Sequence, residues 1–131
     1  MKILLAEDDM QSANALATIL RGQGYEVDVV SDGAEMLAHL DAVDVVLTDV
    51  KMPHMDGVSA ATIIKQRIDK RLPIIAITGF LEKYLETEGL PFDKILRKPL
   101  VLAEVITCIE LAVGLRLAHA GPDHGRRKTD A

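Results

Sequence analysis

Five short apolar segments recur along the chain, and each is too short for a typical helix. Three of them, at residues 3–6, 43–47 and 74–77, are continuous apart from Asp44 and rich in β-branched side chains. Continuous runs of this length are typical of strands buried on both faces, as in a parallel sheet. Residues 25–30 alternate more, which indicates a strand nearer an edge, and residues 94–97 are predicted to form the last strand.

Apolar residues at helical spacing fill the intervals between these strands. The patterns cover residues 13–20, 58–68 and 101–117, a segment opening at 31–35, and a weaker segment at 81–88. Gly22 and Gly24 end the first helix, while Asp32 and Glu35 have the spacing of a capping box. Regular alternation of strands and helices predicts right-handed crossovers and a parallel sheet covered on both faces. The sequence therefore indicates an α/β fold of five strand–helix units.

The end of the chain has a different character. Residues 118–131 (AHAGPDHGRRKTDA) are polar and lack periodicity, so we expect one domain over residues 1–117 and a flexible tail over 118–131. The tail carries a basic cluster, Arg126, Arg127 and Lys128. A solvated tail is the default interpretation, and a partner-recognition or localisation signal is the alternative.

Composition narrows the classes of function. The chain has 131 residues, 49% of them hydrophobic, and a net charge of −5. That charge gives no general attraction to nucleic acid or to an anionic membrane, although a local basic patch remains possible. No apolar run is long enough to span a bilayer and no signal peptide is seen, so we expect a cytoplasmic protein. The single cysteine, Cys108, falls in helical register with apolar residues and is predicted to be a core residue.

Polar residues follow the predicted strands directly. In an open parallel sheet, ligands bind outside the carboxyl ends of the strands, so these positions are the candidates for chemistry. They are Glu7, Asp8 and Asp9 after the first strand, Asp49 and Lys51 after the third, Thr78 after the fourth and Lys98 after the fifth. Asp9 is expected to cap the next helix, whereas the remaining side chains should meet in one pocket.

This set of residues suits phosphoryl transfer. Clustered carboxylates repel one another, and a hard cation such as Mg²⁺ relieves the repulsion through oxygen ligands. A carboxylate can also be a nucleophile toward phosphorus, which gives an aspartyl phosphate. Phosphoryl transfer then needs mainly positioning and charge neutralisation, here from Mg²⁺ and Lys98, with the Thr78 hydroxyl as a hydrogen-bond donor.

Four stretches of the chain carry a family resemblance: ILLAEDD at 3–9, VVLTDVKMPHMDG at 45–57, IIAITG at 74–79 and ILRKP at 95–99. The sequence resembles the receiver domain of bacterial two-component response regulators, of the stand-alone type, from about residue 2 to 117. The resemblance implies the flavodoxin-like (βα)5 receiver fold, a five-stranded parallel sheet with strand order 2-1-3-4-5.

The resemblance also implies roles around the phosphoacceptor. Asp49 stands where receivers carry the phosphorylated aspartate. Glu7 and Asp8 match the acidic pair, in which Asp8 would contact Mg²⁺ directly and Glu7 mostly through water. Lys51 matches the residue whose backbone carbonyl binds the metal.

Further positions match the residues that receivers use to switch conformation, and others depart from the family pattern. Thr78 corresponds to the switch hydroxyl, and Lys98 to the lysine that precedes a usually cis proline, here Pro99. Receivers commonly carry Tyr or Phe where this chain has Ile95, and a small residue where it has Gly79-Phe80. The stretch from Thr78 to Lys98 is slightly short, so an abbreviated fourth helix is expected.

The function implied is a phosphorylation-controlled signalling switch and not a turnover enzyme. A histidine kinase or histidine phosphotransfer protein would be the donor, choosing its receiver at residues 11–20 and 100–103, and an unidentified protein would be the target, with no nucleic acid or membrane involved. Alternatives are a binding module that works without phosphorylation, and a Mg²⁺-dependent phosphatase of the haloacid-dehalogenase type. Lys51 argues against the phosphatase, because it occupies the place of that family's second acid. The four histidines are interpreted as solvated and non-functional.

Overall fold

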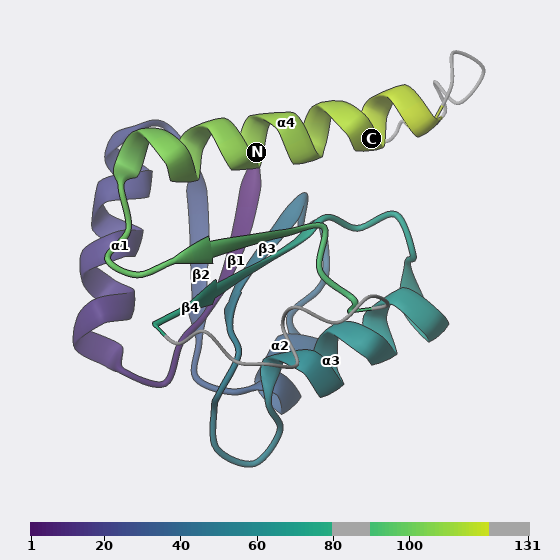
Figure 1. Ribbon diagram of the computed structural model, residues 1–131, viewed down its shortest axis with the longest axis horizontal. Helices are drawn as coiled ribbons and strands as arrows, with labels where there is room; N and C mark the ends of the chain where they lie inside the picture. Colours follow the sequence, from purple (N-terminus) through teal and green to yellow (C-terminus); the bar gives the residue numbers. More distant parts are fainter. Residues whose placement is uncertain (80–89, 121–131) are drawn as a thin grey trace.

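A five-stranded parallel sheet forms the centre of the fold (Figure 1). The computed structural model describes residues 1–79 and 90–120, except for the side chains of residues 117–120. The strand order is β2-β1-β3-β4-β5, which confirms the predicted order 2-1-3-4-5. The strands are β1 (Lys2–Ala6), β2 (Glu26–Val30), β3 (Val45–Asp49), β4 (Ile74–Thr78) and β5 (Lys94–Arg97).

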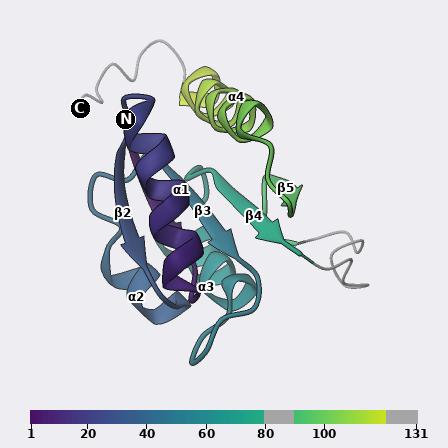
Figure 2. The ribbon, with the colours of Figure 1, turned by 90° about the vertical axis from the view of Figure 1, so that its left-hand side faces the viewer.

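Helices cover both faces of the sheet, as Figures 1 and 2 show. They are α1 (Met10–Gly22), α2 (Gly33–Ala38), α3 (Gly57–Ile63) with the π-helical turn η1 (Ile64–Ile68), and α4 (Leu102–Ala120). Side chains alternate along β1, so Ile3 and Leu5 pack with α1 and α4, while Leu4 and Ala6 pack with α2 and α3. Both faces of the central strands are therefore core, as their continuous apolar runs predicted.

Side-chain caps fix where the helices begin. Asp9 caps α1 by accepting hydrogen bonds from Gln11 N and Ser12 N, which confirms its expected structural role. Asp32 Oδ1 accepts from Glu35 N at 2.8 Å at the start of α2. Glu35 returns the bond to Ser31 N, one residue earlier than in a standard capping box.

Several element limits differ from the sequence-based expectation. The third strand begins at Val45 and continues to Asp49, because Thr48 is fully buried and its hydroxyl is satisfied by the Asp49 carbonyl. The helix expected over 58–68 changes at Ile64 into a π-turn, and the last helix runs to Ala120, into the segment expected to be tail. The expected helix at 81–88, Phe80, and residues 121–131 of the predicted tail lie outside the described residues.

Two smaller expectations are confirmed. Cys108 is buried in the cluster beneath α1 and α4, and burial raises the pKa of its thiol. The Lys98–Pro99 peptide bond is cis. Among the helices of residues 1–79 and 90–120, none has both the length and the apolar character that crossing a bilayer requires.

Candidate functional site

Three carboxylates from two strand ends meet at the carboxyl edge of the sheet. Oxygen atoms of Glu7, Asp8 and Asp49 all lie within 4.8 Å of one another. Glu7 is buried, Asp49 is partly buried and Asp8 is exposed. An exposed carboxylate beside two less exposed ones leaves room for water, which suits a hard cation that keeps part of its hydration shell. The donor set therefore fits Mg²⁺.

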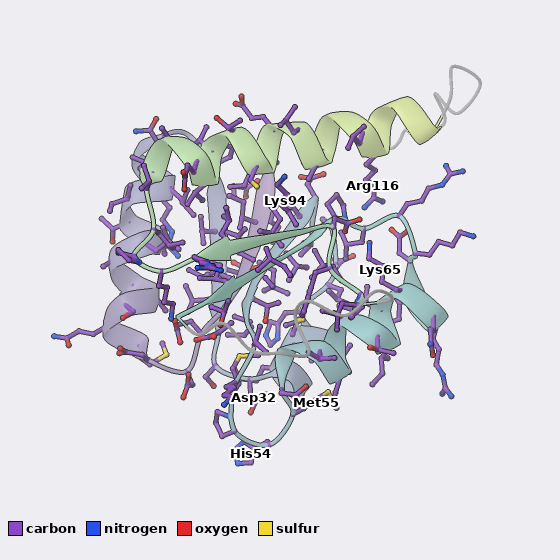
Figure 3. The ribbon with its side chains drawn as sticks, viewed as in Figure 1. Asp32, His54, Met55, Lys65, Lys94 and Arg116 are labelled. Atoms are coloured by element: carbon purple, nitrogen blue, oxygen red, sulfur yellow. The ribbon has the colours of Figure 1, made fainter. Side chains whose placement is uncertain are left out.

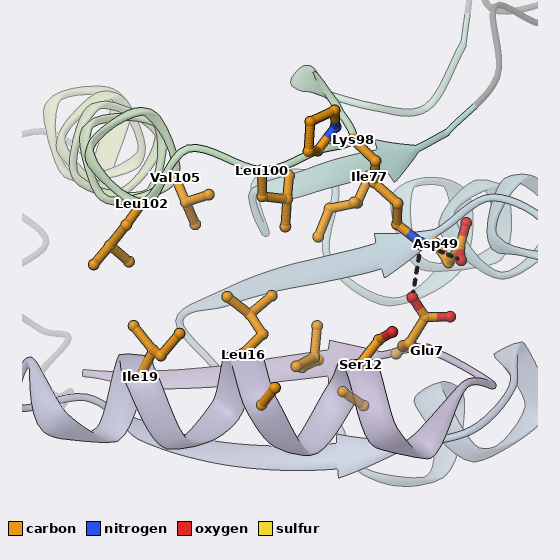
Figure 4. Close-up of a pocket in the computed structure, with 15 residues that line it drawn as sticks. Glu7, Ser12, Leu16, Ile19, Asp49, Ile77, Lys98, Leu100, Leu102 and Val105 are labelled. Carbon is orange, nitrogen blue, oxygen red and sulfur yellow. Dashed lines mark hydrogen bonds and ion pairs between the residues drawn. The ribbon is translucent and has the colours of Figure 1, made fainter.

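Lys98 bridges this cluster from the end of β5, as Figure 4 shows. Its Nζ donates to Glu7 Oε1 at 2.9 Å and to Asp49 Oδ2 at 3.2 Å. Partial burial of the ammonium favours the neutral amine, but the bond to Glu7 and the charge of Asp49 outweigh burial and raise the pKa of Lys98. The lysine is therefore a cation at any physiological pH, placed to neutralise negative charge at Asp49.

The backbone around Asp49 is held tightly on the side away from solvent. Asp49 Oδ1 accepts from Val50 N at 2.8 Å, and Gly57 N donates to Val50 O at 2.8 Å. Gly57 has no side chain, and a Cβ there would collide with the Asp49 carbonyl oxygen. The close approach of α3 to Asp49 thus depends on glycine.

Thr78 and Lys51 occupy the positions that the sequence implied. Thr78 ends β4 beside Asp49, since Asp49 pairs with Ile77 in the sheet, and its side chain is buried. The Thr78 carbonyl accepts from Lys98 N at 2.8 Å, which links the two strand ends. Lys51 lies in the loop after β3 with an exposed side chain. The metal-binding role of its carbonyl remains a prediction.

An apolar groove of about 360 Å³ leads into this site (Figure 4). Glu7, Asp49 and Lys98 line its charged end. Much of its remaining wall comes from α1, the loop after β5 and the first turn of α4, through Leu16, Ile19, Leu100, Leu102 and Val105. The groove thus joins the acidic site to the regions expected to choose the phosphoryl donor.

One contact beside the site was missed from the sequence. His54 Nδ1 lies 2.9 Å from Asp32 Oδ2, and Gly33 N donates to Met55 O at 2.8 Å, so the loop after β3 is tied to the start of α2 (Figure 3). His54 adopts a left-handed backbone with φ of 64°. Twenty-two residues separate the paired side chains, and no local sequence signal connects them.

Ile95 stands on β5 at the edge of the sheet, where receivers commonly carry an aromatic residue. It is 36% exposed, and β5 buries only Leu96 among its four residues. The chain therefore has a small, branched side chain on this edge in place of an aromatic ring.

Comparisons with known proteins agree with this geometry. Residues 3–110 match the response regulator receiver domain family. The transcriptional regulatory protein PdtaR of Mycobacterium tuberculosis is 38% identical over 117 residues, covering 86% of this chain and 56% of that protein. The chain thus spans about half the length of that relative.

Two further matches extend over nearly the whole of the related chain. The response regulator receiver protein CpdR of Brucella abortus is 37% identical over 113 residues, 83% of this chain and 93% of that protein. The receiver domain of the sensor histidine kinase PA1611 of Pseudomonas aeruginosa, solved with magnesium in its active-site cleft, has a TM-score of 0.77. It is 31% identical, and the match covers 86% of this chain and 97% of that one.

The family match confirms the predicted class, a response regulator receiver domain. The fold, the strand order and the acidic cluster of the structure agree with this class. The chain belongs to the response regulator receiver domain family.

Proposed function

We propose that Asp49 accepts a phosphoryl group from a phosphohistidine donor, in a Mg²⁺-dependent reaction of two-component signalling in the cytoplasm. The observation that carries the proposal is the position of Lys98 Nζ, 2.9 Å from Glu7 and 3.2 Å from Asp49, beside the cluster completed by Asp8. One lysine and three carboxylates supply a nucleophile, a cation for the phosphoryl oxygens and ligands for a metal ion.

The chemical step has a simple balance. An Asp49 carboxylate oxygen attacks phosphorus, the phosphorus–nitrogen bond of the donor breaks, and the imidazole nitrogen of the donor leaves with the bonding electrons. Mg²⁺ held by Asp8, Asp49 and the Lys51 carbonyl, with Glu7 acting through water, would neutralise the transferred oxygens. Lys98 donates hydrogen bonds to the same oxygens, and its raised pKa keeps it charged throughout.

Donor docking is assigned to the apolar groove beside Asp49. Leu16 and Ile19 of α1 face Leu100 and Leu102 across it, and its charged end reaches Asp49 and Lys98. A helix carrying an exposed phosphohistidine beside apolar residues would bury those residues in the groove and bring phosphorus to Asp49. A histidine kinase or a histidine phosphotransfer protein has this chemistry.

Output is proposed to pass through Thr78 and Lys98 to an unidentified protein target. Thr78 follows the residue paired with Asp49, and its carbonyl is bonded to Lys98 N, so movement toward a phosphoryl group would shift both strand ends. Ile95 in place of an aromatic favours one second candidate, a receiver-fold binding module that works without phosphorylation.

Intact mass after incubation with acetyl phosphate and Mg²⁺ tests the proposal. Wild type should gain one phosphoryl group, Asp49→Asn none, and a chelator should prevent the gain. Absence of an adduct, together with failure to bind beryllofluoride, would favour the phosphorylation-independent module. Sustained hydrolysis of phosphate monoesters would instead support the phosphatase alternative.

A further inference from the structure

A second pocket lies at the edge of the sheet opposite Asp49, at the amino ends of β4 and β5. Its volume is about 440 Å³, within the range of small-molecule sites. Its wall combines the segment before β4, the residue before β5 and the later turns of α4, chiefly through Lys70, Arg71, Pro73, Asp93, Leu115 and Arg116. Figure 3 shows Arg116 reaching down from α4, on the side of the sheet edge where Lys65 also lies.

The carboxylates around this pocket are already engaged. Asp93 Oδ2 accepts from Lys65 Nζ and from Ile74 N, each at 2.8 Å. Asp69 accepts from Arg116 Nη2 at 2.8 Å and from Arg71 N at 2.9 Å. Both acids therefore have cationic partners of their own.

The remaining charge in the pocket is positive. Within residues 1–79 and 90–116, the side chains of Lys70 and Arg71 form no ion pair, although both line the pocket and are exposed. The whole chain carries a net charge of −5, so this region has the opposite sign to the molecule around it. Such a local excess attracts anions by Coulombic interaction, most strongly at low ionic strength.

Arg116 adds a donor without an acceptor. Its Nη2 is bonded to Asp69, but its Nη1 is buried and has no hydrogen-bond partner. In the described part of the chain, it is the one buried side-chain nitrogen or oxygen in that condition. Guanidinium groups bind oxyanions through two nitrogens. Nη1 is shielded from solvent, so a phosphate oxygen beside Lys70 and Arg71 would reach it once the Arg116 side chain, which is 27% exposed, turns toward the pocket.

We propose that this pocket binds a small phosphate-bearing ligand of about nucleotide size. Lys70, Arg71 and Arg116 would hold the phosphate, while Pro73, Ala112 and Leu115 provide an apolar surface for a ring. The site is separate from Asp49, at the other end of the strands. Occupancy of this pocket would therefore depend on the cellular concentration of its ligand and not on the phosphoryl donor.

Amide chemical shifts of the full chain, titrated with ADP and with inorganic phosphate, test this proposal. A chelator is included so that no metal draws either probe to Asp49. ADP should shift amides at 69–72 and 112–116 and leave those at 7–9, 49–51 and 98 unchanged. Phosphate should shift the same pocket amides at higher concentration, because it lacks the ring. Equal affinity for the two probes would contradict the nucleotide-sized part of the proposal.

Paired charge variants separate a pocket from general attraction. K70Q/R71Q should weaken ADP binding by about tenfold or more, since it removes two charged contacts. R67Q/R97Q removes the same charge from exposed residues outside the pocket and should change the affinity less than about twofold. Equal weakening of ADP binding by both pairs, or no amide shift at 69–72 and 112–116, would overturn the proposal. Replacing Arg126, Arg127 and Lys128 by glutamine should leave the amide shifts of the pocket unchanged. If these shifts disappear in that variant, the ligand binds to the tail and not to the pocket.

Discussion

Lys98 Nζ lies closer to Glu7 Oε1, at 2.9 Å, than to Asp49 Oδ2, the proposed phosphoacceptor, at 3.2 Å. The buried Glu7 thus holds the ammonium in place before any phosphoryl group arrives. Preorganised charge of this kind needs little rearrangement during reaction.

Lys98→Met should slow phosphorylation of Asp49 by acetyl phosphate by about tenfold or more, because one preorganised cation is lost from the transition state. Lys98→Arg should retain part of the rate, since it keeps the charge but not the shape. The initial rate of mass gain in saturating Mg²⁺ measures the effect. An unchanged rate in Lys98→Met would show that the lysine does not assist transfer.

The raised pKa of Lys98 predicts a pH window for its contribution to stability. A lysine with a higher pKa in the folded state stabilises fully below its ordinary pKa of 10.5, and this contribution disappears as the pH rises through the folded value. The difference in melting temperature between wild type and Lys98→Met, without metal, should be constant from pH 8 to 10 and shrink above that. A difference that grows at high pH would contradict the sign.

Asp49→Asn should raise the melting temperature of the metal-free protein by roughly 2–5 °C, because it relieves repulsion among three clustered carboxylates, two of which share Lys98. Added Mg²⁺ should stabilise wild type by mass action and the variant less. Asp41→Asn, which removes an exposed acid far from the cluster, is the matched control and should show neither effect. A metal-free Asp49→Asn protein that melts below wild type would contradict the clustered-acid geometry.

The contact between His54 and Asp32 should hold the loop after β3. Asp32→Asn keeps an N-capping side chain but loses the charged acceptor for His54, whereas Asp32→Ala loses both, so stability should fall in that order. Bonds from Glu35 N and then from His54 lower the pKa of Asp32, so its contribution exists above the ordinary value of 3.8 and disappears as acid protonates the folded state. Denaturant unfolding at pH 7 and near pH 3 tests this, with the variants expected to converge on wild type at the lower pH.

Gly57→Ala should destabilise the domain by about 1–3 kcal/mol, because its Cβ would meet the Asp49 carbonyl and the Thr48 hydroxyl. Gly114→Ala is the control, since a Cβ there meets nothing within 4 Å and alanine favours the helix by about 0.5–1 kcal/mol. The two substitutions should change the free energy of unfolding, measured with denaturant, in opposite directions. A neutral Gly57→Ala would show that α3 does not approach Asp49 so closely.

Much of the fold and the site could be predicted because their signals are local. Apolar runs identified the strands, and the rule that ligands bind at strand ends gathered Glu7, Asp8, Asp49 and Lys98 from distant parts of the chain. Strand order was predicted by family resemblance and not by periodicity.

The details that were missed depend on tertiary contacts. Thr48 looks like the end of a strand until its hydroxyl is seen to be satisfied within the core. The His54 side chain is largely exposed, as predicted, but its contact with Asp32 was missed because the partner is remote in sequence. The π turn was missed because a single wide turn shifts the apolar spacing by only about one residue. No pattern within a short stretch of sequence predicts any of these features.

The π-turn after α3 has a consequence for how the protein can vary by inheritance. Asp69 N bonds to Ile64 O across the wide turn, and the Asp69 side chain holds Arg116 at the basic pocket. The wide turn takes up one residue more than an α turn, so loss of one codon within 65–68 would leave Asp69 N bonded to Ile64 O as in an ordinary α turn. A single in-frame deletion would thereby keep Asp69 in nearly the same place beside Arg116. Receivers one residue shorter at this point are therefore expected to keep an acid that can pair with the arginine of the last helix.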